Sequence, residues 1–147
     1  MDRFNSFTLA ISNISRYIYK IEAEEMKKFN LKPQHISCLY YLNTNGSLTS
    51  KELVDISLED KASISRSIKY LEKNGYIICE SNAKKRYNDS FMLTEKGKEI
   101  SNKISIIISD VLELGSNGLN DDERNNLYKY LYIITKNLEK ILKSYKN

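Results

Sequence analysis

The chain has 147 residues, a formal net charge of +4, 41% hydrophobic residues and 29% charged residues, a composition typical of one globular domain rather than of a disordered or fibrous chain. It lacks a signal-peptide pattern and any apolar run near the roughly 18 residues of a membrane span, so we expect a cytoplasmic protein with no membrane partner. Two scattered cysteines and one histidine do not make a zinc site, and we expect neither a metal nor a cofactor.

The first predicted element is a long amphipathic helix over residues 4–29. Its apolar side chains recur at alternating spacings of three and four, which is the pattern of a narrow helical seam. The seam consists of Phe4, Phe7, Ile11, Ile14, Ile18 and Ile21. Pro33, the only proline, suits the first position of a second helix. We expect this second helix to end near Gly46.

Two shorter helices follow, separated by a polar turn. Thr49 and Glu52 have the spacing of a capping box, in which each side chain accepts a hydrogen bond from the other residue's amide. Asp60 is the predicted N-cap of the next helix, which ends at Gly75. The inward stripe of that helix is Ile64, Ile68 and Leu71.

The hydrophobic period changes from helical to strand-like after residue 75. Residues 76–80 and 90–94 are short strand-like runs, and the polar segment 81–89 between them predicts a two-stranded hairpin with a basic tip. Thr94 can cap a long helix, and Asn120 can begin a last one after the break at residues 115–120. The predicted fold is therefore mainly α, with a small two-stranded β wing.

Helices at both ends of the chain carry seams of heptad type. One small globular centre has too little surface to cover three such helices, and pairing with a second copy would bury the seams at roughly 25 cal/mol per Å² of apolar area. We therefore expect a homodimer. An intramolecular helical bundle is the alternative interpretation.

The order helix, helix, helix, hairpin over residues 33–97 is that of a winged helix-turn-helix. In such a unit, the second helix of the helix-turn-helix enters the major groove of DNA. Here its outer face carries short side chains and bases, which permit a close approach to phosphates and charge-assisted contacts. The candidate DNA-binding residues are Lys61, Ala62, Ser63, Ser65, Arg66 and Lys69 on this helix, and Lys84, Lys85 and Arg86 at the hairpin tip. The alternative for each group is an ordinary solvated charged surface.

The sequence resembles the multiple-antibiotic-resistance regulator (MarR) family of bacterial transcription factors over nearly its whole length. The similarity is carried by "LKPQHISCLYYL", "LTSKELVDISLEDKASISRSIKYLEKNGYI", "FMLTEKGKEI" and "GLNDDERNNLYKYL", in the family's order and spacing. The resemblance implies a single domain in which residues 1–32 and 98–147 form a helical dimerisation region and residues 33–97 bind DNA. It also implies a homodimer that binds a palindromic operator in double-stranded DNA, in most members as a repressor.

One position departs from the family pattern. The wing of the family carries Asp-x-Arg, whereas this chain has Lys84-Lys85-Arg86. The arginine is kept and the aspartate that orients it is replaced by Lys84. We therefore expect wing contacts that depend more on salt and less on base sequence.

Many relatives release DNA when a small aromatic ligand binds, which makes Tyr17, Tyr40 and Tyr41 candidate ligand-binding residues. Ordinary packing of amphipathic tyrosines is the competing interpretation. Some relatives sense oxidants through a cysteine in the first helix, which is absent here. We expect Cys38 and Cys79 to be buried, inert thiols.

Two other functional classes fit the sequence less well than a DNA-binding regulator. A degenerate winged-helix homodimer that binds only proteins would have no need of the two basic elements. An enzyme is not supported, because the chain has neither a glycine-rich phosphate loop after a strand nor a nucleophile with an organised base.

Overall fold

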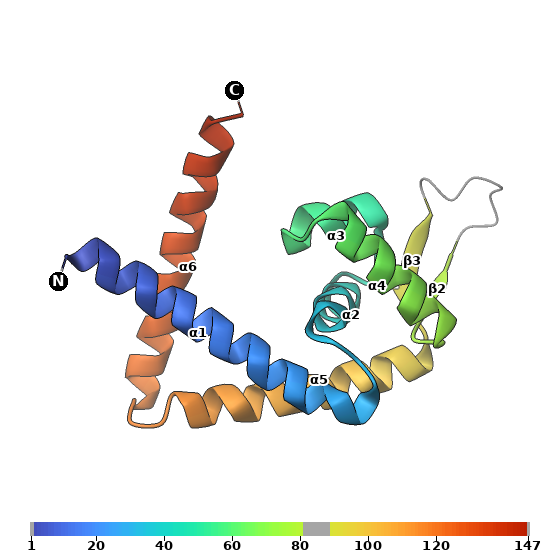
Figure 1. The fold of residues 1–147 in the computed structure, drawn as a ribbon, viewed down its shortest axis with the longest axis horizontal. Helices are drawn as coiled ribbons and strands as arrows, with labels where there is room; N and C mark the ends of the chain where they lie inside the picture. Colours follow the sequence, from blue (N-terminus) through green and yellow to red (C-terminus); the bar gives the residue numbers. More distant parts are fainter. Residues whose placement is uncertain (1, 81–88, 147) are drawn as a thin grey trace. The chain divides into compact units, whose positions relative to one another are not determined.

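The computed structural model describes residues 2–80 and 89–146 (Figure 1). Its elements confirm a mainly α fold with a small sheet. In chain order they are α1 (Arg3–Met26), the 3-10 helix η1 (Lys27–Phe29), α2 (Pro33–Asn45), β1 (Ser47–Thr49), α3 (Ser50–Ser57), α4 (Lys61–Lys73), β2 (Ile77–Cys79), β3 (Ser90–Leu93), α5 (Glu95–Gly115) and α6 (Asp121–Ser144). The chain forms two compact units, Met1–Ile108 and Ser109–Asn147.

The predicted helix starts are confirmed by their hydrogen bonds. The Glu52 amide donates to Thr49 Oγ1 at 3.2 Å, and the Thr49 amide donates to Glu52 Oε2 at 2.7 Å. Asp60 accepts from the Ser63 amide at 2.8 Å, and Asn120 begins α6 with a second capping box. These side chains satisfy amides that have no carbonyl one turn earlier.

The end of the first helix differs from the prediction. The α-helix stops at Met26 and continues as one 3-10 turn to Phe29. Asn30 then adopts the left-handed conformation, with φ of 55°, which small amide side chains tolerate better than most. The reversal buries Leu31 and sets the direction in which Pro33 begins α2.

The expected two-stranded hairpin is part of a three-stranded antiparallel sheet. The strand order is β1-β3-β2, and β3 pairs with both neighbours. The sequence prediction missed β1, because its three residues include the α3 cap, Thr49, and are too few to show alternation. Ser47 in β1 also donates to Glu80 Oε2 after β2, at 2.5 Å.

A single hydrophobic core fills the unit Met1–Ile108. It is built from the inward faces of α2, α3 and α4, the sheet and the first half of α5, and Met26 alone joins it from within α1. The buried apolar residues are Met26, Leu31, Cys38, Leu39, Leu42, Leu53, Ile64, Ile68, Leu71, Ile77, Phe91, Leu93, Ile100 and Ile104. In the unit Ser109–Asn147, α6 has no buried residue over its described length.

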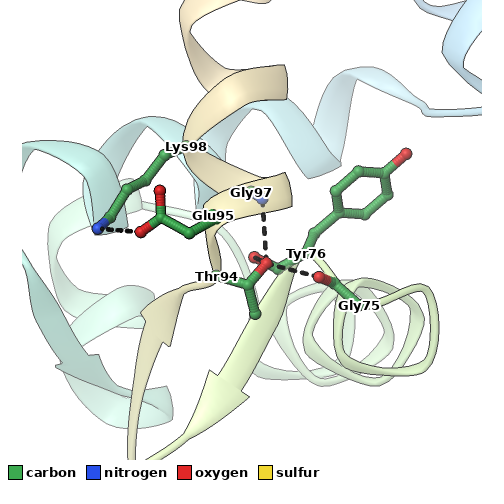
Figure 2. A network of polar contacts seen from close by, with 6 residues as sticks. All are labelled: Gly75, Tyr76, Thr94, Glu95, Gly97 and Lys98. Carbon is green, nitrogen blue, oxygen red and sulfur yellow. Dashed lines mark hydrogen bonds and ion pairs between the residues drawn. The ribbon is translucent and has the colours of Figure 1, made fainter.

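The start of α5 is hydrogen-bonded to the segment that follows α4 (Figure 2). Thr94 Oγ1 donates to the Gly75 carbonyl at 2.6 Å and accepts from the Gly97 amide at 3.1 Å. The Thr94 amide donates to the Tyr76 carbonyl at 3.0 Å. Gly97 lies so near this carbonyl that an added Cβ would be 2.0 Å from its oxygen. This contact fixes where α4 ends relative to α5.

None of the helices in the described ranges is both long enough and apolar enough to span a bilayer.

Candidate nucleic-acid interface

Helix α4 is anchored by one face. Ile64, Ser67, Ile68 and Leu71 are buried, and the Asp60 cap fixes the first turn. A Gly75 φ of 76° then ends the helical path, in a conformation that glycine adopts without strain. The buried stripe and the two fixed ends determine which residues face outward.

The outward face of α4 carries most of the predicted DNA-binding residues. Lys61, Ala62, Ser65, Arg66 and Lys69 are exposed. Ser63 is half-exposed, and its hydroxyl donates to Glu59 Oε2 at 3.4 Å. Through its hydrogen bonds to Asp60 and Glu59, Ser63 belongs to the start of the helix as well as to its outer face.

The cations of this face have no ion-pair partner among the described residues. Within residues 2–80 and 89–146, no carboxylate lies within ion-pair distance of Lys61, Arg66 or Lys69, whereas Lys98 and Lys103 on α5 each pair with a glutamate on their own helix. An exposed row of unpaired bases with short side chains between them is chemically suited to a polyanion.

A hollow of about 600 Å³ adjoins this face. It lies between the end of α1, the start of α2 and the side of α4. Its lining is Ala23, Lys27, Asn30, Leu31, Lys32, Pro33, Gln34, His35, Arg66 and Tyr70. Arg66 therefore belongs both to the outer face of α4 and to this hollow.

His35 lies at the hollow in a constrained environment. It is 4% exposed. Its Nδ1 accepts from the Lys32 amide at 3.0 Å, so this nitrogen carries no proton. Burial, and secondarily the charge of Lys32, lowers the pKa of His35. Neither His35 nor Tyr70 was a predicted site residue, and only their contact in space reveals them.

The wing residues Lys84, Lys85 and Arg86 lie outside the described residues. The structure places each of the three candidate ligand residues. Tyr17 and Tyr40 are 61% and 60% exposed, and Tyr41 is half-buried against the core. Tyr40 and Tyr41 contact edge to face at 5.2 Å. The hollow beside Arg66 is lined by other residues.

The two thiols occupy different environments. Cys38 is fully buried, and burial together with the Glu59 charge raises its pKa to about 12. Cys79, in β2, is half-buried. Over the described part of the chain, no three histidine, cysteine or acidic side chains are grouped so that they could hold a metal ion.

Comparison with known proteins gives a consistent picture. A sequence profile of the MarR family matches residues 29–86. The regulator SarZ of Staphylococcus epidermidis is 28% identical over 129 residues, which are 86% of this chain and 84% of SarZ. A SlyA-like transcription regulator from Listeria monocytogenes is 31% identical with a TM-score of 0.78, over 88% of this chain and 86% of that one. A MarR family regulator from L. monocytogenes, solved with 26mer DNA, is 29% identical with a TM-score of 0.79, over 94% and 89% of the two chains.

Proposed function

The chain belongs to the MarR family of winged-helix transcriptional regulators, and on that premise we propose that it is a homodimeric repressor of a palindromic operator. The observation that carries the proposal is the outer face of α4, where Lys61, Arg66 and Lys69 are exposed without an ion-pair partner among the described residues. The similar regulator from L. monocytogenes was solved with DNA, which supports the same partner here.

The proposed mode of binding follows from the position of α4. Its first turns enter the major groove, Ala62 and Ser65 allow close approach, and Arg66 reaches base edges or phosphates. Lys61 and Lys69 contact phosphates. The residues Lys84, Lys85 and Arg86 of the wing would reach a neighbouring minor groove, where a narrow A·T-rich segment attracts cations.

A second copy of the chain is the proposed cover of the end helices. On α1, Phe4 is 70% exposed, Ile14 54% and Ile21 41%, although their spacing is that of a packed seam. On α6, Leu138 and Ile141 are 55% and 52% exposed. Apolar stripes of this length are characteristic of protein interfaces. A twofold dimer would present two α4 helices to half-sites about one DNA turn apart, roughly 10 base pairs.

In this proposal the dimer represses by occupying a promoter, and repression is relieved when the separation of the two α4 helices changes. Both α4 helices must fit the two half-sites at once, so a signal that changes their separation releases the operator. We propose a small aromatic ligand as this signal, with Tyr17, Tyr40 and Tyr41 as its contacts. The edge-to-face contact of Tyr40 with Tyr41 provides an aromatic surface of the required kind.

Arg66→Ala tests the assignment of the recognition helix. Operator affinity, measured by mobility shift against competitor DNA, should fall by at least about 1–3 kcal/mol per half-site. Lys103→Ala is the matched control, since Lys103 is an exposed base on α5 that pairs with Glu99. A normal footprint by Arg66→Ala would show that α4 does not read the operator.

The second candidate function is a winged-helix homodimer that binds a protein instead of DNA. The exposed apolar seams of α1 and α6 suit either function. The cations of α4, which have no ion-pair partner in the part of the chain that the structure describes, favour DNA, because a face that had lost nucleic acid would have no need of such charge. Failure to bind the promoter of its own gene, together with an intact dimer, would favour this alternative.

A further inference from the structure

The hollow beside Arg66 is a basic surface that extends beyond the outer face of α4. Three of its lining residues, Lys27, Lys32 and Arg66, are cations at neutral pH, and its lining includes no aspartate or glutamate. All three lie within the unit Met1–Ile108. The hollow is therefore electropositive without a local counter-charge in its lining.

The three cations are not equivalent. Lys27 is occupied, because its Nζ contacts both carboxylate oxygens of Glu24 at 2.8 and 2.9 Å. Lys32 and Arg66 have no carboxylate within ion-pair distance in the described ranges. The net attraction of the hollow for an anion therefore comes from Lys32 and Arg66.

The first turn of α2 adds to this charge. Pro33 has no N–H, and the next amide, that of Gln34, has no carbonyl one turn earlier within the helix. Gln34 also lines the hollow. A helix start of this kind favours a negative group near its free amides.

We propose that this hollow is a phosphate-contacting site of the protein, in which Lys32 and the start of α2 hold the DNA backbone beside the groove that α4 occupies. The proposal rests on the proposed function. We infer DNA as the occupant because the hollow is continuous with the outer face of α4, and Arg66 belongs to both. A duplex contacted by that face would bring a phosphate strand past the same side chain. Lys32 lines the same hollow, is exposed, and has no ion-pair partner in the described ranges.

The chemistry of the contact predicts a distinctive behaviour. Phosphate contacts neutralise charge without reading base sequence, so Lys32 should add equally to operator and non-operator binding. The Lys32 side chain makes no cap hydrogen bond at the start of α2. Its replacement can therefore remove the charge without removing a helix cap.

The test compares Lys32→Gln with the wild-type protein and with Lys103→Gln as a control of equal charge change. In a salt series, the slope of log K against log [salt] should fall by about 0.9 per lost contact, or about 1.8 for a dimer, with equal losses on operator and random duplexes. Ethylation interference should lose one phosphate position per half-site in Lys32→Gln and none in Lys103→Gln. Lys32→Arg should restore both readouts.

An unchanged salt slope and an unchanged ethylation pattern in Lys32→Gln would overturn the inference. That result is distinguishable from failure of the proposed function. If Arg66→Ala loses the operator while Lys32→Gln does not change, α4 reads DNA and Lys32 does not contact it. If the wild-type protein binds no duplex, the proposed function itself is wrong.

Discussion

The imidazole of His35 lies stacked on the phenol ring of Tyr70, with the ring centroids 4.5 Å apart and the planes 7° apart. The Tyr70 hydroxyl donates to the carbonyl of Asn30, and His35 Nδ1 accepts from the Lys32 amide. Tyr70 belongs to α4, whereas the other three residues lie at the junction of α1 and α2. This cluster therefore connects α4 to the end of the first helix.

Tyr70→Phe should weaken this connection while keeping the ring stack. Removing the hydroxyl leaves the Asn30 carbonyl without this donor, at a cost of about 1 kcal/mol in the free energy of unfolding. Urea denaturation of the variant measures the loss. Tyr130→Phe is the control, because Tyr130 on α6 is 55% exposed. An equal change in both variants would show that the contact with Asn30 contributes nothing.

Stability should depend on pH through His35. Because its folded-state pKa is lowered, the unfolded chain binds the proton more readily than the folded one. The free energy of unfolding therefore rises with pH across the window between the folded pKa and the unfolded value of about 6.5. Above that window the titration of His35 costs no stability. Below it, the loss in the free energy of unfolding reaches its full value.

The measurement is a series of denaturation curves at pH values below 7. His35→Gln should lower the stability at pH 7.5, because it removes the ring stack, but should flatten the slope within this window. A wild-type slope that persists in His35→Gln would assign the effect to other groups.

Sequence patterns predicted the helices, their caps and the outward face of α4, because these depend on neighbours three or four residues away. Thr49, Asp60 and Asn120 were identified for this reason. Contacts between distant segments could not be predicted in this way. The stack of His35 on Tyr70 joins residues 35 positions apart, and β1 is defined only by its pairing with β3. The hollow beside Arg66 depends on three helices at once.

The close approach at the start of α5 predicts a sharp contrast between two glycines. In Gly97→Ala the new Cβ would meet the Tyr76 carbonyl oxygen at 2.0 Å, so backbone must shift. We expect a loss of about 1–3 kcal/mol in stability. Gly115 is in the same helix with nothing within 4 Å of an added Cβ, so Gly115→Ala should be neutral or stabilising by up to about 1 kcal/mol.

Thermal or urea unfolding of the two variants checks this contrast. Because Thr94 bonds both to Gly97 and to the Gly75 carbonyl, a displaced α5 should also loosen the end of α4. Gly97→Ala should therefore bind operator more weakly under conditions in which it is still folded. Equal stability of the two alanine variants would contradict the packing described here.

Cys38 should be inert toward oxidants and alkylating reagents in the folded protein. The thiolate is the reactive form, and a pKa of about 12 together with complete burial leaves almost none of it accessible at pH 8. Iodoacetamide should therefore modify the half-buried Cys79 first, and should modify both thiols at similar rates in denaturant. Mass spectrometry of peptides from timed reactions separates the two sites. Alkylation of Cys38 as fast in the native protein as in denaturant would show that the core between α2 and α4 opens and exposes the thiol. Release of DNA by peroxide from the wild-type protein but not from Cys38→Ser would show, in addition, that DNA binding is regulated through Cys38.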